Sequence, residues 1–592
     1  MSAKLWVARL SIVAVVLASM VIGGTPAQAA SQAVTGTVLL ASNGGGVARR
    51  EWTASGGAVN GVNGYVFAVD PATVGTAFTL GLAATNQGVG APSIAFYTDM
   101  TNGITCSSYD GNPGAAGVVC GDHAIVYLLT GANTTFTYVS GGPVPAPPPF
   151  QASKFTFTSP ISLPFAAGQT QGNIGEPSVD VDPSNGNIYV TSPTGIPCGI
   201  NPNDECVAFW RSTDGGTSFS QPAPTAFQHP LGGGDSDVIH DGLGHVFIAD
   251  LRSLVDIGLW RSIDQGNTWT GSQVGPCADR EWIAWGGPNA PTGPLTIYET
   301  QNSGVCVPGA LLQFWRSVDD GITYLPLGVV ASASDLKQLG YTLDQAVQGA
   351  VEAKMGVDQV TGAIYIAWAT QAIEDATNAS SRLLVVSRSG DGGSTWTHSL
   401  AYAGPLGTSI QNLFPVLAVD HGGNVYGAFS TQLPGSLMGV YVTISKDQGR
   451  TWSTAQRVNP ADQTAVFPAI AAGDQGRVDL IWIGTPGTSV SDPSNQWNIF
   501  LGQSRNATAG SPRWSVGQIS AKVMHIGDIC NRGLNCNIFG GNRDLADFIS
   551  VTIDVDGNAH AVWTDDASQS PKAIMFAKQI GGPTTGKRPP KS

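Results

Sequence analysis

Ser212-Thr-Asp214-Gly-Gly216-Thr-Ser-Phe219 is the stretch of sequence that decides the fold, because its pattern is repeated along the chain. The pattern S-x-D-x-G-x-x-aromatic occurs five times, and a sixth, irregular copy runs from Ser504 through Asn506 to Trp514. We call each copy a box. The Asp carboxylate can accept hydrogen bonds from backbone N–H groups of a tight turn, and the Gly can take the positive φ that closes a hairpin. The boxes are therefore predicted to be structural turns, with their Ser, Asp and Gly at Ser212, Asp214, Gly216; Ser262, Asp264, Gly266; Ser317, Asp319, Gly321; Ser389, Asp391, Gly393; and Ser445, Asp447, Gly449.

A longer repeat surrounds each box. The box follows a strand-like run such as residues 207–211 (VAFWR), and upstream lies an apolar strand, a turn with carboxylate and glycine, and another apolar strand. This upstream unit occurs seven times, first at residues 177–190. Four strands per unit are typical of a propeller blade. The sequence predicts an all-β propeller of seven blades, with six as the alternative.

The last unit has no box and stops near residues 573–578, one strand short of a blade. Residues 155–158, just before the first unit, are predicted to supply the missing strand. Closing the ring in this way would remove exposed sheet edges. A short helix is expected at residues 334–350.

Outside the propeller, the chain is predicted to contain four further parts. Residues 1–29 have the basic start, apolar run and small-residue cleavage site of a secretory signal peptide. Residues 30–140 are predicted to form a small β-sandwich-like domain, with strands at 93–97, 124–129 and 134–139. Residues 141–153 form a Pro-rich linker, the propeller spans 154–580, and 581–592 are a polar tail.

Composition limits the possible partners. The chain has 76 Gly, 37 Pro and only 12% charged residues, which suits many short strands and tight turns. Its formal net charge of -14 argues against nucleic acid or anionic membranes as partners. No close Cys/His spacing indicates a metal, so no metal site and no cofactor are expected.

The eight cysteines fall into four sequence-near couples. Because the chain is predicted to be secreted into an oxidising environment, four local disulfides are expected. The couples are Cys106 with Cys120, Cys198 with Cys206, Cys277 with Cys306, and Cys530 with Cys536.

The boxes resemble those of the bacterial neuraminidase repeat, or Asp-box, superfamily, which includes sialidases. The resemblance covers about residues 155–580. More narrowly, residues 232–237, 279–282 and 547–557 look like segments of secreted bacterial proteins labelled sialidase-like. The resemblance implies a secreted propeller that acts on a glycan, as an exo-glycosidase. The alternative is a non-catalytic propeller that binds a glycan or protein at the cell surface.

One departure from the family leaves the activity open. Sialidases hold the substrate carboxylate with three arginines, and one of these normally lies in an Arg-Ile-Pro motif entering the first blade. This chain has Gly175-Glu176-Pro177 at that place, without arginine. The departure counts against ordinary sialidase chemistry, because guanidinium groups match a carboxylate in charge and geometry.

The candidate site residues are the charged residues just before the first strand of each blade, where loops gather around the propeller axis. Arg280 and Arg543 are predicted to bind substrate. Paired carboxyl groups flank the scissile bond in glycoside hydrolysis, so the catalytic candidates are Glu176, Asp235, Asp237, Glu281, Glu352 and Asp547. Asp279, Lys354 and Asp544 belong to the same charged set. Ion pairing between blades remains the alternative for all of them.

Overall fold

The structure is a computed structural model. It describes residues 155–586 apart from 170–172, 196–205, 224–225, 228–232, 253–255, 276–278, 303–309, 333–338, 340–350, 353, 371–380, 406, 411–413 and 531–541. Before residue 155 it describes only the backbone of strands. The signal peptide and the helix expected at 334–350 therefore lie outside the described residues, except for Leu339. Among the described residues, no helix has the length and apolar character needed to cross a bilayer.

Two compact units divide the chain, Met1–Gly142 and Pro143–Ser592. The first contains β1 (Gln32–Ala41), β2 (Val47–Val59), β3 (Val62–Val69), β4 (Thr79–Ala84), β5 (Ser93–Tyr97), β6 (Ala124–Thr130) and β7 (Phe136–Gly141). One sheet has the order β1-β2-β3-β6-β5, and β4 pairs with β7 in a second. The three strands expected from the sequence correspond to β5, β6 and β7. That the two sheets form a sandwich stays a prediction.

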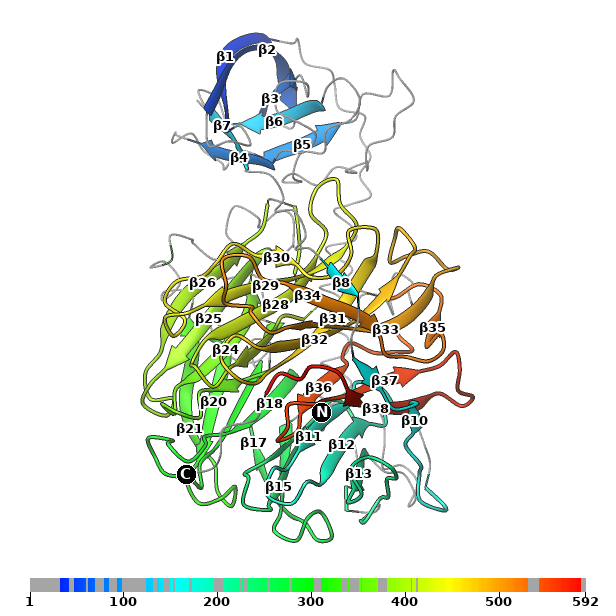
Figure 1. The fold of residues 1–592 in the computed structure, drawn as a ribbon. Helices are drawn as coiled ribbons and strands as arrows, with labels where there is room; N and C mark the ends of the chain where they lie inside the picture. Colours follow the sequence, from blue (N-terminus) through cyan, green and yellow to red (C-terminus); the bar gives the residue numbers. More distant parts are fainter. Residues whose placement is uncertain are drawn as a thin grey trace, which may run out of the picture. The chain divides into compact units, whose positions relative to one another are not determined.

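The second unit is a propeller of seven four-stranded blades, and the prediction of an all-β, seven-bladed fold is confirmed. Figure 1 shows the blades following one another from cyan to red. Blade 1 has β11 (Ser178–Val181), β12 (Ile188–Pro193), β13 (Val207–Ser212) and a bridge at Ser220; blade 2 has β14 (Ser236–His240), β15 (Val246–Arg252), β16 (Asp256–Ser262) and β17 (Thr270–Val274); blade 3 has β18 (Asp279–Trp285), β19 (Ile297–Asn302), β20 (Ala310–Ser317) and β21 (Leu325–Ser332).

The remaining blades repeat the same order. Blade 4 has β22 (Val351–Glu352) and β23 (Gly356–Val357) beside β24 (Ile364–Thr370), then β25 (Leu383–Ser389) and β26 (Thr397–Ala403); blade 5 has β27 (Val416–Val419), β28 (Val425–Thr431), β29 (Gly439–Ser445) and β30 (Gln456–Arg457). Blade 6 has β31 (Thr464–Ala472), β32 (Val478–Thr485), β33 (Gln496–Ser504) and β34 (Trp514–Gln518), with β35 (His525–Ile526) and β8 (Phe150–Ala152) added; blade 7 has β36 (Ser550–Ile553), β37 (Ala559–Asp565) and β38 (Ala573–Gly581).

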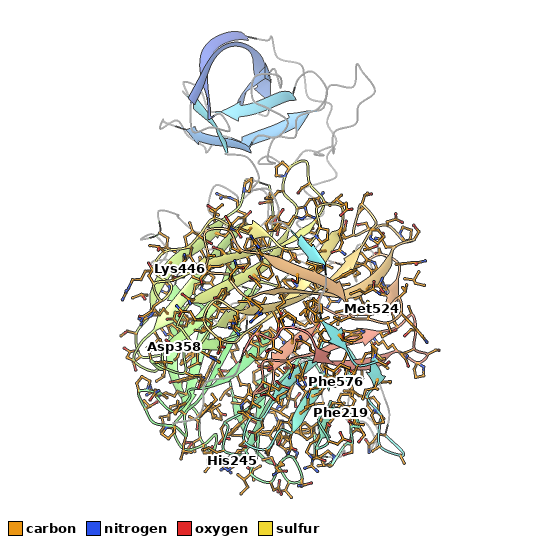
Figure 2. The ribbon with its side chains drawn as sticks, viewed as in Figure 1. Phe219, His245, Asp358, Lys446, Met524 and Phe576 are labelled. Atoms are coloured by element: carbon orange, nitrogen blue, oxygen red, sulfur yellow. The ribbon has the colours of Figure 1, made fainter. Side chains whose placement is uncertain are left out.

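The two ends of the propeller chain close the ring. The strand missing from blade 7 is supplied by β9 (Thr156–Phe157), which lies within the predicted residues 155–158, and by β10 (Ile161–Ser162), which lies just beyond them; both pair antiparallel with β38. Figure 2 shows Phe219 of the first box beside Phe576 of β38; their ring centroids lie 4.9 Å apart. Blade 1 is therefore joined to blade 7 by hydrogen bonds and by aromatic packing.

The box turns have the hydrogen bonds that their sequence predicts. In the fourth box, the Ser389 hydroxyl donates to Asp391 Oδ1 at 2.8 Å and accepts from the Gly393 N–H at 2.8 Å. Thr395 donates its N–H to Oδ1 of the same aspartate at 2.9 Å and its hydroxyl to Oδ2 at 2.6 Å. Equivalent bonds form in the other four regular boxes. These aspartates serve the turn itself.

Each box also contacts the preceding blade. The Gly of a regular box lies against an aromatic ring one blade back, so closely that a Cβ placed on Gly393 would come within 2.1 Å of Phe314. Four tyrosines of the second strands are fully buried inside the blades, namely Tyr189, Tyr298, Tyr365 and Tyr426. The box is thus both a hairpin turn and an interblade contact.

Candidate functional site

The first strands of the blades line a channel along the propeller axis. Residues from all seven first strands surround a cavity of about 480 Å³ toward the ends of these strands. Toward their starts, a smaller cavity of about 40 Å³ is lined by residues of six blades, in or next to their first strands. The predicted site residues lie at the starts of the first strands. They are therefore at the same end of the channel as the smaller cavity.

The backbone is unusual where several first strands begin. Glu176, Arg280, Phe414 and Phe467 have positive φ values of 50°, 51°, 36° and 51°, although none of them is glycine. At Arg280 the pairing of β18 with β19 also shifts register. Left-handed backbone at such residues costs free energy and tends to occur at functional sites. The other described non-glycine residues with positive φ are Ala546, next to Asp547, and three box residues, Gln265, Asp320 and Gln448, so such backbone occurs both at this end of the channel and in the box turns.

Arg280 fills this end of the channel. Its guanidinium carbon lies 3.8 Å from the ring centroid of Trp282 and 4.0 Å from that of Phe548, so the group packs against two rings that stand at 88° to each other. Its Nη1 lies 3.3 Å from Asp235 Oδ1 and 4.0 Å from Glu176 Oε2. The side chain is only 8% exposed. Blades 1, 2, 3 and 7 therefore meet at this arginine.

Arg543 belongs to the same group. It forms a two-pronged contact with Asp547, Nη1 to Oδ1 at 3.2 Å and Nη2 to Oδ2 at 2.6 Å. The backbone N–H of Asp547 donates to Glu176 Oε1 at 2.9 Å, although the two residues are 371 positions apart in sequence. We call the connected set Glu176, Asp235, Arg280, Arg543 and Asp547 the axial cluster.

Burial changes the protonation of two carboxyl groups in the axial cluster. The pKa of Glu176 is raised well above its ordinary value, first by burial and then by the charge of Asp235. Burial also raises the pKa of Asp547 to about 6, even though Arg543 opposes the shift. A carboxyl group that keeps its proton near neutral pH can act as a general acid when another carboxylate lies close by.

Asp237, a further catalytic candidate, lies deeper in the channel and is fully buried. It accepts hydrogen bonds from Ser178 Oγ at 2.7 Å, Lys354 Nζ at 2.8 Å and the Ile283 N–H at 3.3 Å. These donors come from blades 1, 4 and 3. The carboxylate oxygens of Asp237 are thus used to join four blades.

The remaining candidates are not part of the axial cluster. Glu281 is fully buried, and among the described residues neither of its carboxyl oxygens has a hydrogen-bond partner. Burial raises its pKa well above the ordinary value. Asp544 is exposed. Glu352 and Asp279 lie in β22 and β18, but their side chains fall outside the described residues.

Sequence reasoning missed the aromatic part of the site. Trp282 and Phe548 each follow a charged candidate in the chain and read as ordinary core residues. The two residues occupy equivalent positions near the first strands of two different blades, and this equivalence was the sequence signal that could have identified them as part of the site. Asp180 and His240, which form a close buried contact at the other end of the channel, were also not selected as a pair.

The structure tests the cysteine predictions only in part. Cys206 and Cys530 are the two described cysteines, and both are disulfide-bonded. The expected partner of Cys206 is Cys198 and that of Cys530 is Cys536, and both partners lie outside the described residues. Both members of the other two couples also lie outside the described side chains, namely Cys106 with Cys120 and Cys277 with Cys306. None of the four pairings is shown by the structure, so all four stay predictions.

No protein-family model matches the chain, and no curated protein matches it in sequence. Solved structures with a similar fold include a protein of unknown function from Dyadobacter fermentans. It has 12% identity and a TM-score of 0.39, and the match covers 72% of this chain and 99% of that one. The leech intramolecular trans-sialidase has 12% identity and a TM-score of 0.37, covering 94% of this chain and 92% of its own. The Aleuria aurantia lectin has 11% identity and a TM-score of 0.35, covering 59% and 96%. These likenesses are too distant to indicate which residues act, or on what.

Proposed function

We propose that this chain is an exported glycoside hydrolase, distantly related to the sialidase-like propellers, that cleaves a neutral glycan at the axial cluster. The observation that carries the proposal is the meeting of Glu176, Asp235 and Asp547 in one buried group where two carboxyl pKa values are raised. Export is part of the proposal and rests on the predicted signal peptide.

The roles follow from protonation and exposure. Glycoside hydrolysis needs one carboxyl group to protonate the leaving oxygen and a second, ionised group as base or nucleophile. Glu176, whose pKa is raised by burial, is the proposed acid. Asp235 is the proposed second group because its side chain is the most exposed carboxylate of the cluster, at 16% against 7% for Glu176 and 8% for Asp547.

The charge of the cluster favours a neutral substrate. Arg280 and Arg543 already contact carboxylates of the protein, and with Glu176 protonated the two arginines balance Asp235 and Asp547. A sugar carboxylate would have to compete with these internal partners for the guanidinium groups. The missing arginine at Gly175-Glu176-Pro177 points the same way.

A second function is favoured by one observation. Every charged side chain of the axial cluster has a partner within the protein, as expected if the cluster only holds blades together. In that case the propeller would bind a glycan or protein without cleaving it.

Turnover of chromogenic glycosides separates the two functions. Wild-type protein, Glu176→Gln and the control Glu299→Gln are assayed on a panel of neutral glycosides and one sialoside. Glu299 is equally buried in blade 3, and burial alone raises its pKa. We expect hydrolysis of a neutral glycoside, a loss of about 100-fold or more in kcat for Glu176→Gln, and little change for the control. A folded wild type that cleaves no member of the panel would refute the hydrolase and leave the binding function, which glycan-array binding then tests.

A further inference from the structure

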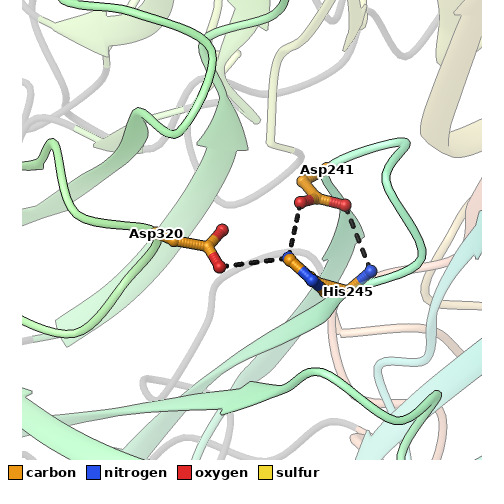
Figure 3. Close-up of side chains that lie close together, drawn as sticks. All are labelled: Asp241, His245 and Asp320. Atoms are coloured by element: carbon orange, nitrogen blue, oxygen red, sulfur yellow. Dashed lines mark hydrogen bonds and ion pairs between the residues drawn. The ribbon is translucent and has the colours of Figure 1, made fainter.

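Two carboxylates and an imidazole meet at the junction of blades 2 and 3, where two neighbouring turn residues are joined by a third residue from the next blade. Asp241 and His245 lie in the turn between β14 and β15, and Asp320 lies in the box of blade 3. Figure 3 shows the three side chains pointing toward one another. His245 Nδ1 is 2.8 Å from Asp241 Oδ2 and 3.0 Å from Asp320 Oδ2. One ligand atom from each residue lies within 4.8 Å of the other two.

These close contacts do not have the geometry of hydrogen bonds. Asp241 Oδ2 and His245 Nδ1 are buried, and among the described residues neither has a hydrogen-bond partner. Asp320 Oδ1 also has none, whereas Asp320 Oδ2, the oxygen near His245, accepts from Arg261. His525 and Asp566 show the ordinary arrangement, with a well-formed hydrogen bond at 2.9 Å. The atoms at the blade 2–3 junction are thus close in space but are not satisfied by one another.

The local backbone leaves one oxygen of Asp241 for another partner. Its Oδ1 accepts the N–H groups of Leu243 at 2.7 Å and His245 at 3.1 Å, which fixes the turn. Its Oδ2 then points into the junction. Asp241 and Asp320 are 0% and 5% exposed. Burying carboxylates in this way is costly unless a cation compensates them.

The neighbouring junction shows what the same scaffold does without such groups. Between blades 1 and 2, Asn187 takes the place of His245 and Gln265 takes the place of Asp320. Gln265 and Asp320 both precede the box glycine and have φ values of 63° and 61°. There, Asn187 Nδ2 donates to Gln265 Oε1 at 3.1 Å, an ordinary hydrogen bond between two amides. At the blade 2–3 junction both amides are replaced by side chains that bind metals.

We propose that Asp241, His245 and Asp320 bind a divalent transition-metal ion that joins blades 2 and 3. Nitrogen and oxygen ligands about 2.1 Å from a tetrahedral zinc lie about 3.4 Å apart, so the observed separations of 2.8 and 3.0 Å would widen by about 0.5 Å when the ion binds. An imidazole in the set favours zinc and its neighbours over calcium and magnesium. Two carboxylates balance the charge of a divalent ion.

Arg261 and the exposure of His245 complete the site. Arg261 donates from both Nε, at 3.0 Å, and Nη2 to Asp320 Oδ2 and so holds this carboxylate in place, as partners of metal ligands do. Its positive charge opposes the ion, so the affinity should be moderate. The His245 side chain is 24% exposed, which gives the ion a route from solvent.

Metal titration of the whole protein tests the site independently of any hydrolase activity. Protein without an affinity tag is treated with a chelator, dialysed at pH 7.5 and titrated with ZnCl2 by calorimetry, and with CoCl2 while visible absorption is recorded. The double variant H245N/D320Q copies the amide pair of the blade 1–2 junction and is expected to fold. The reciprocal variant N187H/Q265D builds the new ligands into that junction.

We expect wild type to bind zinc at this site, the double variant to lose one zinc equivalent or bind it at least tenfold more weakly, and the reciprocal variant to gain one. The cobalt absorption bands should follow the same order. Zinc binding in the double variant that equals wild type, or no zinc uptake by wild type up to about 1 mM, would overturn the proposal. If the double variant does not fold, the single variant H245N and its cobalt spectrum decide in the same way.

Discussion

Replacing the box glycine by alanine should cost different amounts in two boxes that have nearly the same backbone. Gly393 and Gly449 have φ values of 90° and 79°. A Cβ on Gly393 would lie 2.1 Å from Phe314, whereas a Cβ on Gly449 would lie 3.3 Å from its nearest neighbour, Tyr365. The first contact cannot exist without movement of the ring, while the second needs only a small adjustment.

The expected magnitudes follow from these two geometries. Left-handed backbone at a non-glycine residue costs about 1–2 kcal/mol, and this term is common to both variants. Overpacking a buried site costs about 1–3 kcal/mol more. Phe314 is 1% exposed and is packed against Tyr298 and Trp396, with centroids 5.6 and 5.1 Å away, so it has little room to move. We expect losses of about 1–2 kcal/mol for Gly449→Ala and about 2–5 kcal/mol for Gly393→Ala.

Urea unfolding followed by tryptophan fluorescence measures both variants, and Phe314→Leu supplies the control. If the ring is the cause, Phe314→Leu combined with Gly393→Ala should cost less than the two single changes added together, by about 1 kcal/mol or more. Equal losses in Gly393→Ala and Gly449→Ala, with additive behaviour of the double variant, would refute the idea that box glycines are needed for contact between blades.

Three further predictions concern single features of the fold. Asp391→Ala should lower the free energy of unfolding by about 1–3 kcal/mol, because the turn loses its hydrogen-bond acceptor, and Asp391→Asn should lower it by less. The folded fraction of either variant should bind ligand and turn over substrate like wild type, and a changed substrate preference would contradict this. Peptide mapping without reduction should return Cys206 in a disulfide with Cys198 and Cys530 in a disulfide with Cys536, and cross-pairing would show the local assignment to be wrong. Burial raises the pKa of Asp479 to about 7, so the folded state keeps a proton that the unfolded chain loses near pH 4. Wild-type stability should therefore fall as the pH rises from about 4 to 7 relative to Asp479→Asn, and parallel melting temperatures of the two proteins across that range would argue against it.

Much of the architecture was predictable because the signals are local. A box needs only its own Ser, Asp and Gly to close a hairpin, as the bonds around Asp391 show, so each copy can be recognised wherever it occurs. The upstream unit of two apolar strands and a turn, which occurs seven times including once without a box, predicted the number of blades in the same way. Even the strand added by residues 155–158 followed from counting, since blade 7 was one strand short and an open ring would leave an edge.

The candidate site was predictable only as a set of positions. The sequence indicated that charged residues before the first strands would gather at the axis, and Arg280 and Arg543 do join Glu176, Asp235 and Asp547 there. Ion pairing was the open alternative, and the sequence did not decide between it and arginines free to bind a substrate.

The sequence by itself thus determined the blades, their turns and the closure of the ring, because these depend on neighbours a few residues apart. Only the tertiary structure decided which side chains meet. Glu176 and Asp547 are 371 residues apart, and Asp320 reaches His245 from the next blade. Such pairs depend on how far each blade is rotated about the common axis and on where a bulge such as that at Arg280 directs a side chain. Those quantities are set by packing between blades, which no local pattern records.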